Sequence, residues 1–125
     1  ESVDAIIHTH SPYATAFAVL NEPIPIILIE MVVFLGGEIR TAEFATPGTA
    51  PVGGNAVKAL RNRKACLLNN HGVVGVGKTL DEAYIGAVYT EDSAKICYMA
   101  RSMGTPKLVP QWGEDELRKM YNIPR

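Results

Sequence analysis

The chain has 125 residues, of which 47% are hydrophobic and 20% are charged, and both values are close to those of ordinary globular domains. Its formal net charge is -1 at pH 7, so the balance of charges does not favour nucleic acid or an anionic membrane as a partner. The longest apolar segment, from Ile24 to Leu35, is interrupted by Pro25 and Glu30 and is too short to span a bilayer. We therefore expect a single folded domain.

The cysteines and the first residue carry two further expectations. Cys66 and Cys97 fall at positions where the apolar pattern predicts burial. Buried free thiols are typical of a reducing compartment, so we expect a cytoplasmic location, with a disulfide as the less favoured alternative. Because the chain begins with Glu1 and reaches its first strand within a few residues, we expect the numbering to start inside a longer native chain.

The first predicted element is a strand from Val3 to His10, in which side chains alternate between two faces. His8 and His10 fall on one face, with their Cα atoms about 6.5 Å apart, because side chains in a strand repeat with a period of two. Two imidazoles at that spacing are able to share one metal ion.

A helix over Pro12–Leu20 should follow, with Ser11 as its N-cap. The N-terminus of this helix would favour negative charge near the histidines, such as a phosphate or enolate oxygen. Asn21–Pro25 is expected to form a loop because its prolines restrict the backbone. The apolar pattern of Ile26–Leu35 fits a helix or a strand, and a short helix from Glu30 is slightly favoured.

The middle of the chain is divided by glycines. Gly36–Gly37 indicates a turn, and Glu38–Phe44 alternates enough to predict a strand. After a loop that ends at Gly53–Gly54, Asn55 is expected to cap a short helix that ends at Leu60. The basic run Arg61–Lys64 is typical of a solvated helix end.

Two strands, Ala65–Leu68 and Val73–Val76, are predicted on either side of a tight corner that contains His71. Thr79 and Glu82 form a capping box for the longest helix, over Leu80–Met103. The spacing of its apolar residues predicts a buried stripe made of Leu80, Tyr84, Ala87, Val88, Ala94 and Tyr98.

Glu91 lies on or beside that stripe, and we interpret it as half of an ion pair within the helix or at a subunit interface rather than as a catalytic group. After a proline-rich linker, a final helix is expected over Glu114–Met120. Trp112 and Tyr121 are expected to anchor this helix to a neighbouring element.

The three histidines carry the main chemical hypothesis. Together, His8, His10 and His71 offer three imidazoles, which suit Zn²⁺ and leave at least one coordination position open for water or substrate. Zinc is the first choice, and hydrolysis and carbanion chemistry are both possible on these residues alone. Asn69 and Asn70 either fix an imidazole tautomer or satisfy the backbone of the turn.

The residues from Gly72 to Thr79 also match the nucleotide-binding pattern G-x-x-x-x-G-K-T. Because Val73–Val76 has the composition of a strand, and because the chain leaves little room for a nucleotide pocket, nucleotide binding is the less favoured interpretation.

Four short motifs together resemble the class II aldolase/adducin family, which is typified by L-fuculose-1-phosphate aldolase. They are His8-Thr9-His10-Ser11-Pro12-Tyr13-Ala14, Gly36-Gly37, Ala45-Thr46-Pro47-Gly48-Thr49 and Asn70-His71-Gly72. The resemblance extends roughly from Val3 to Gly104. Residues 1–125 would then form one domain of this type, its C-terminal two thirds, without the N-terminal segment.

The resemblance implies an α/β fold with three layers, α/β/α, around a largely antiparallel sheet. It implies a zinc site made by His8, His10 and His71 and a homotetramer with active sites between subunits. The implied reaction is the reversible cleavage of a ketose 1-phosphate into dihydroxyacetone phosphate and an aldehyde, a carbon–carbon lyase activity in carbohydrate metabolism. The Walker-like match would then be coincidental.

Two features of the chain depart from the family pattern. The family glutamate that acts as general base would lie upstream of this chain, so no residue here takes that role. Phe44 stands where the resemblance places a tyrosine that, in family aldolases, donates a proton from a neighbouring subunit. The alternatives that the family offers are a sugar-phosphate epimerase, a dehydratase and a non-catalytic adducin-like assembly module.

Overall fold

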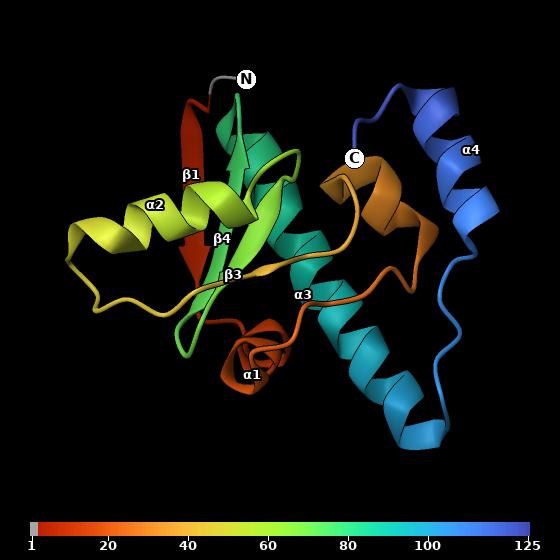
Figure 1. Ribbon diagram of the computed structural model, residues 1–125, viewed down its shortest axis with the longest axis horizontal. Helices are drawn as coiled ribbons and strands as arrows, with labels where there is room; N and C mark the ends of the chain where they lie inside the picture. Colours follow the sequence, from red (N-terminus) through yellow and green to blue (C-terminus); the bar gives the residue numbers. More distant parts are fainter. Residues whose placement is uncertain (1–2) are drawn as a thin grey trace.

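The structure, a computed structural model, describes residues 3–125. Its elements are β1 (Ala5–Thr9), α1 (Pro12–Leu20), the π-helical turn η1 (Met31–Leu35), β2 (Thr41–Ala42), α2 (Ala50–Ala59), β3 (Ala65–Leu68), β4 (Gly72–Gly77), α3 (Leu80–Met103) and α4 (Gln111–Tyr121). Figure 1 shows the strands crossing in the middle of the molecule, with α4 standing at one side.

The sheet has four strands in the order β1-β4-β3-β2. The pairs β1–β4 and β3–β4 are antiparallel, whereas β2 runs parallel to β3. His8 pairs with Val74 across the first of these ladders. This register brings the end of β1 beside the corner that precedes β4, which is where His71 lies.

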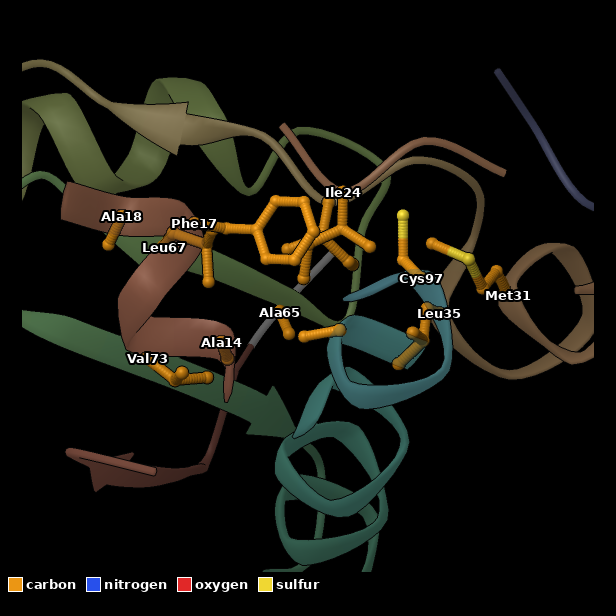
Figure 2. Close-up of a cluster of buried hydrophobic side chains, with 12 residues drawn as sticks. Ala14, Phe17, Ala18, Ile24, Met31, Leu35, Ala65, Leu67, Val73 and Cys97 are labelled. Carbon is orange, nitrogen blue, oxygen red and sulfur yellow. The ribbon is translucent and has the colours of Figure 1, made fainter. Parts of the chain in front are cut away.

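One face of the sheet is covered by α1 and α3. Its buried cluster takes side chains from both helices, from η1 and from the strands; Figure 2 shows Phe17, Ile24, Leu35, Leu67 and Cys97 among its members. Burial of apolar side chains of this size stabilises a fold by about 1.5–3 kcal/mol each. This cluster is the main core of the protein.

The opposite face is partly covered by α2, which packs on β2 and β3. A smaller buried cluster lies there, formed by Ala42, Ala59, Cys66 and Leu68. Helices therefore lie on both faces of a mostly antiparallel sheet, and the predicted α/β/α fold is confirmed.

The helix α3 approaches β4 very closely because the strand is rich in glycine. A methyl group at Gly75 would lie 2.5 Å from the carbonyl oxygen of Ala83, and one at Gly77 would lie 2.5 Å from Glu82 Cβ. The glycines of the Walker-like pattern are thus positions where a helix backbone lies against a strand. Residues 72–77 form a β-strand and not a phosphate-binding loop.

The bounds of α1 and α3 agree with the sequence prediction, but the predicted buried stripe of α3 is wrong. Four of its six members are exposed, namely Leu80, Tyr84, Val88 and Tyr98. The face of α3 that meets the sheet is made of small residues instead: Ala83, Gly86, Ala87, Thr90, Ser93 and Ala94, together with Cys97. Close packing against glycines in β4 leaves no room for large side chains there.

Other boundaries also differ from the predictions. The helix α2 begins at Ala50 with Thr49 as N-cap, so Gly53–Gly54 lies inside the helix. The side chain of Asn55 donates to the carbonyl oxygen of Glu43 at 3.1 Å instead of capping a helix. The predicted strand Glu38–Phe44 shrinks to two residues of β2 and an isolated bridge between Ile39 and Ile24.

The basic run Arg61–Lys64 is not entirely solvated, because Arg63 is 9% exposed. Its guanidinium donates to the carbonyl oxygens of Glu38 at 2.8 Å and Asn62 at 3.0 Å. Burial, followed by repulsion from Arg40 and Arg118, lowers the pKa of Arg63 to about 10.

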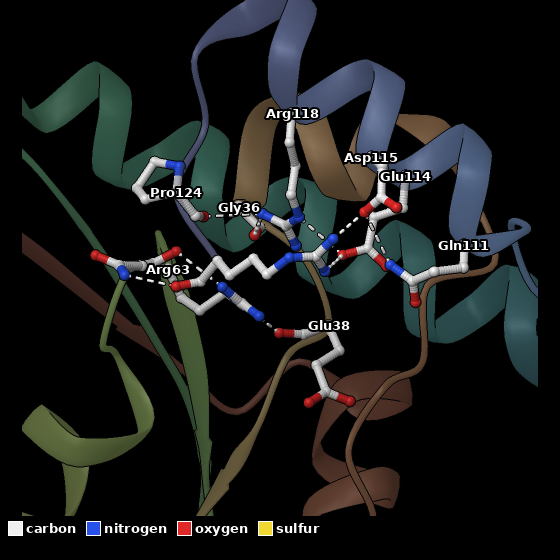
Figure 3. Close-up of polar contacts among 10 residues, drawn as sticks. Gly36, Glu38, Arg63, Gln111, Glu114, Asp115, Arg118 and Pro124 are labelled. Atoms are coloured by element: carbon white, nitrogen blue, oxygen red, sulfur yellow. Dashed lines mark hydrogen bonds and ion pairs between the residues drawn. The ribbon is translucent and has the colours of Figure 1, made fainter.

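The contact between α4 and the rest of the fold is made by Arg118 and not by aromatic anchors. Trp112 and Tyr121 are 68% and 55% exposed. Arg118 pairs with Glu114 at 2.7 Å and donates to the carbonyl oxygens of Gly36 at 2.9 Å and Pro124 at 2.8 Å, as Figure 3 shows. Gly37 lies directly against Arg118 and Arg63, with φ of 138°.

Both cysteines are buried and free. Among residues 3–125, no helix is long and apolar enough to cross a membrane.

Candidate metal centre

The three histidines predicted from the sequence lie together at one end of the sheet. One nitrogen from each of His8, His10 and His71 lies within 4.8 Å of the others. The ring centroids are 4.7 to 5.0 Å apart, and the rings are tilted or edge-on to one another rather than stacked. The strand β1 supplies His8, the residue after it supplies the exposed His10, and the corner before β4 supplies the half-buried His71.

The tautomer of His8 is fixed by the neighbouring strand. Its Nδ1 lies 2.8 Å from the carbonyl oxygen of Val73, which can only accept a hydrogen bond. Nδ1 must therefore carry the proton, and the lone pair of His8 is on Nε2. A backbone carbonyl is a common partner for the second nitrogen of a metal-ligating histidine.

The lone pair of His8 faces the other rings, since His8 Nε2 lies 3.0 Å from His10 Nε2. Two imidazole nitrogens on one tetrahedral zinc ion lie about 3.3 Å apart. The spacing of His8 and His10 is therefore close to that of two ligands on one ion, and the three ligand nitrogens together lie within 4.8 Å of one another. Three imidazoles are a ligand set that catalytic zinc sites use.

The corner that holds His71 depends on local backbone geometry. Asn70 adopts a left-handed conformation with φ of 58°, which asparagine tolerates better than most residues. Its N–H donates to the carbonyl oxygen of Ala18 at 3.1 Å, and the N–H of His71 donates to that of Leu68 at 3.0 Å. These bonds tie the corner to α1 and β3.

The asparagines do not orient the imidazoles within the described part of the chain. The hydrogen bonds of the rings go to Val73 and to each other. Asn70 serves the turn backbone, which was one of the two alternatives. Asn69 Oδ1 is buried without a hydrogen-bond partner in residues 3–125, beside His71 in a cavity of about 110 Å³.

The electrostatic environment favours the neutral form of His71. Burial lowers the pKa of its imidazole below the ordinary value, and the neighbouring rings of His8 and His10 lower it further. A neutral imidazole is the form that binds metal ions.

Sequence reasoning missed the role of Glu91. Its carboxylate accepts hydrogen bonds from the N–H of Tyr13 at 3.1 Å and of Ala14 at 2.8 Å, so it caps α1 from a distant helix. The anion at the N-terminus of α1 is thus this side chain. Within residues 3–125 Glu91 has no ion pair, and an ion pair at a subunit interface stays a prediction. Ser11 makes no capping bond to the helix. No local signal identifies such a partner, because 77 residues separate Glu91 from Ala14.

Phe44 lies at the edge of a small cavity beside His71. It is 61% exposed and lines the same cavity as His71 and Asn69. A phenylalanine ring supplies an apolar surface there and no exchangeable proton.

The protein therefore has a three-layer α/β fold, and one end of its sheet carries a cluster of three histidines that could hold a metal ion. The family model described as the class II aldolase and adducin N-terminal domain matches residues 1–98, and the chain belongs to this family.

Relatives and solved structures agree with this assignment. The chain is 36% identical over 118 residues to a 5-methylthioribulose-1-phosphate/5-deoxyribulose-1-phosphate aldolase of Rhodospirillum rubrum, covering 94% of this chain and 52% of that protein. It is 35% identical over 121 residues to a 5-deoxy-D-ribulose 1-phosphate aldolase of Bacillus thuringiensis serovar kurstaki, covering 97% of this chain and 56% of that protein.

A solved structure described as L-fuculose 1-phosphate aldolase is 36% identical and has a TM-score of 0.89, covering 98% of this chain and 57% of that one. Another, the l-fuculose-1-phosphate aldolase from Thermus thermophilus, is 27% identical with a TM-score of 0.72, covering 85% of this chain and 58% of that one. The chain spans about half the length of the relatives it matches.

Proposed function

We propose that His8, His10 and His71 hold a divalent metal ion, with zinc as first choice, in an aldolase that acts on a ketose 1-phosphate. The observation that carries the proposal is the convergence of the three imidazoles, whose ligand nitrogens lie within 4.8 Å of one another. The fixed tautomer of His8 supports it, because the bond to Val73 leaves Nε2 free as a ligand.

The proposed reaction breaks the bond between C3 and C4 of the ketose 1-phosphate. The hydroxyl proton at C4 is removed as the aldehyde forms, and C3 gains a proton to give dihydroxyacetone phosphate. When bound, the ion supplies a Lewis acid that polarises the substrate oxygen atoms. The histidines would hold the ion, and the hydrogen bond that His8 Nδ1 donates to the carbonyl oxygen of Val73 keeps His8 in the ligating tautomer.

The substrate class follows the names of the relatives, which describe 5-deoxyribulose 1-phosphate, 5-methylthioribulose 1-phosphate and L-fuculose phosphate aldolases. The apolar ring of Phe44 beside the site suits a substrate whose far end carries a methyl or methylthio group. Phe44 cannot donate a proton, so the proton of the reaction must come from another group.

Metal analysis tests the site directly. We expect the purified chain to bind close to one zinc ion, measured by mass spectrometry of the metal, and we expect His71→Ala to lose most of it. Asn70→Gly is the matched control, because glycine keeps the left-handed backbone at this position and the side chain of Asn70 does not bond to the rings. Equal amounts of bound zinc in the wild-type and His71→Ala proteins would contradict the proposed metal site.

Product analysis tests the reaction. The zinc-loaded protein, with the upstream segment that the family pattern expects to supply the general base, is incubated with 5-deoxyribulose 1-phosphate or L-fuculose 1-phosphate, and NMR follows the substrate. Dihydroxyacetone phosphate is the expected product, absent with His71→Ala. An epimer or loss of water would indicate the alternative enzymes of this family, and bound zinc with no conversion would contradict the activity but not the metal site.

We also propose a homotetramer in the cytoplasm. Large apolar side chains on α3 are exposed, among them Tyr84 at 60%, Val88 at 42% and Tyr98 at 56%, and such surfaces often form subunit contacts. Analytical ultracentrifugation is expected to show four copies, and a monomer at micromolar concentration would reject this state.

A further inference from the structure

A small cavity of about 110 Å³ lies beside the histidine cluster, between the loop that follows β2 and the corner before β4. His71, one of the three clustered histidines, lines this cavity. A molecule held at the cluster can therefore place one end in it. Most of the remaining wall is apolar and is formed by Phe44, Ala45, Pro47, Val52 and Leu68.

Asn69 adds one buried polar atom to this lining. Its Oδ1 is buried and accepts no hydrogen bond from residues 3–125. The residue directly follows the last residue of β3, Leu68, so the strand fixes its place at the cavity. Because an acceptor removed from water without a donor is costly, buried acceptors in folded proteins are nearly always paired. The cavity is therefore suited to a molecule that donates one hydrogen bond.

The charge of the lining decides which end of a ketose 1-phosphate can enter. Among residues 3–125, no lysine or arginine lines the cavity, whereas the acidic Glu43 does. The backbone N–H groups of Asn70 and His71 are already hydrogen-bonded within the fold. A phosphate group requires cations or free N–H donors, and the acceptor oxygen of Asn69 is neither. The phosphate end is thus excluded, and the aldehyde half of the substrate, from C4 onwards, is the end that fits.

The substrates named for the relatives differ in this half. Cleavage of 5-deoxyribulose 1-phosphate or 5-methylthioribulose 1-phosphate between C3 and C4 gives an aldehyde without a hydroxyl group. L-Fuculose 1-phosphate gives an aldehyde with a hydroxyl group at C5 and a methyl group at C6. An apolar pocket separates such molecules weakly, whereas a pocket with a buried acceptor strongly disfavours the molecule that lacks the donor.

We propose that Asn69 is a specificity-determining residue, whose Oδ1 accepts a hydrogen bond from the hydroxyl group next to the aldehyde carbon. The cavity then selects 2-hydroxyaldehydes with a short apolar end, which lies against Phe44 and Pro47. This inference rests on the proposed aldolase function. Asn69 acts on the choice of the aldehyde half and takes no part in breaking the carbon–carbon bond.

Two aldehydes of equal carbon number test the role of Asn69. L-Lactaldehyde carries the hydroxyl group and propanal lacks it. The zinc-loaded protein used for product analysis joins each aldehyde to dihydroxyacetone phosphate, in the reverse of the proposed reaction, and kcat/KM is measured for both. We expect the wild type to prefer L-lactaldehyde by about tenfold or more. Asn69→Leu keeps the branched shape of the side chain without its polar atoms and should nearly abolish the preference.

Val52→Ala is the matched control, because it enlarges the same cavity and leaves its polar lining unchanged. It should change kcat/KM for both aldehydes by a similar factor and so preserve the preference. The zinc content of Asn69→Leu should equal that of the wild type. A loss of zinc in this variant would assign Asn69 to the support of His71 and overturn its role in substrate choice.

A second measurement needs neither turnover nor a variant. The zinc-loaded wild type is titrated with (S)-propane-1,2-diol or with propan-1-ol, and NMR follows the side-chain amide protons of Asn69. We expect the diol to shift these resonances at a concentration about tenfold lower than propan-1-ol, because only the diol carries the second hydroxyl group.

The outcomes separate this inference from the proposed function. Equal kcat/KM for the two aldehydes in the wild type would overturn it, and so would a preference that survives Asn69→Leu. If neither aldehyde reacts, the aldolase function is contradicted and the titration decides alone. Equal shifts with both alcohols would then reject the hydrogen bond at Asn69, whereas a shift selective for the diol would support it.

Discussion

Gly72 lies directly against His10: a methyl group at this glycine would be 2.9 Å from His10 Cδ2 and in contact with the carbonyl oxygen of Thr9. The first residue of β4 must therefore be glycine for the end of β1 to approach it. The missing side chain at Gly72 leaves room for the His10 ring beside His8 and His71.

The substitution Gly72→Ala is accordingly expected to displace His10 and the end of β1. Overpacking of this kind costs about 1–3 kcal/mol of unfolding free energy. We expect zinc affinity to fall at least tenfold, measured by competition with a chelator. Gly53→Ala is the control, because a methyl group at Gly53 meets nothing within 4 Å and the residue is helical. It should leave zinc binding unchanged and stabilise the fold by up to about 1 kcal/mol.

Glu91→Gln should weaken the N-terminus of α1. The neutral amide still accepts a hydrogen bond from Tyr13 or Ala14, but the interaction of its charge with the helix dipole is lost. We expect a loss of about 1 kcal/mol in urea unfolding and a smaller fall in zinc affinity, since α1 begins two residues after His10. Asp92→Asn, one residue further along α3 and exposed, should change neither the urea unfolding free energy nor the zinc affinity. Equal effects of both variants would argue against a specific cap.

Arg118→Ala is expected to destabilise the protein by about 2–4 kcal/mol. It removes the donor of the carbonyl oxygens of Gly36 and Pro124, and it leaves the carboxylate of Glu114 with only the exposed Arg125, at 3.2 Å. The control is Arg101→Ala, which removes an exposed ion pair with Glu22. That change should cost less than about 1 kcal/mol. Chemical denaturation of the two variants compares them directly, and similar losses would show that the Arg118 cluster is not specially stabilising.

Cys66 is expected to make the stability of the fold fall as the pH rises. Burial raises the pKa of its thiol from 9.0 to about 12, so the thiol stays protonated in the folded protein where an unfolded chain would ionise. The stabilising contribution of the neutral thiol is complete below pH 9 and falls as the pH rises from 9 towards 12.

Alkaline unfolding measurements check this expectation. Cys66→Ala should flatten the loss of stability above pH 9, and the wild-type thiol should react with a thiol reagent at about pH 8 only as fast as the protein opens. Rapid labelling of Cys66 in the folded state would contradict it.

Phe44→Tyr tests whether position 44 faces the substrate. If it does, the added phenol supplies a proton donor and aldol turnover should rise several-fold. Phe34→Tyr is the control, because Phe34 lines a different cavity of the fold. An unchanged rate for Phe44→Tyr would remove this position from the mechanism.

The parts of the fold that could be predicted from the sequence are those encoded by neighbouring residues. The capping box of Thr79 and Glu82 gave the start of α3, and the bond between the N–H of Glu82 and Thr79 Oγ1 at 3.2 Å confirms it. The alternation of β1 placed His8 and His10 on one face. His71 was grouped with them because it is the remaining histidine of the sequence and lies in a tight corner after a strand, and the resemblance to a known family supported the same grouping.

The remaining errors arose where distant segments decide the local structure. The buried face of α3 is made of small residues because the helix packs against the glycines of β4. The pattern of apolar residues along the sequence does not show which strand the helix will meet. Arg63 resembles a surface residue until the carbonyl oxygen of Glu38 is known to lie beside it. Likewise, Glu91 acquires its partners in α1 only when the helices pack.

The close contact of α3 with β4 relates the packing at Gly75 to the position of the histidine cluster at the end of the sheet. Backbone atoms of the strand and helix meet at Gly75 and Ala87, so no flexible side chain adjusts the position of the helix there. Glu91 follows Ala87 by one helical turn on the same side of α3. The distance between α3 and β4 at Gly75 thus sets the position of Glu91. Because Glu91 bonds to the start of α1, it also affects the position of the segment that carries His10. Enlarging Gly75 should therefore alter metal affinity from the far side of the sheet without touching a ligand.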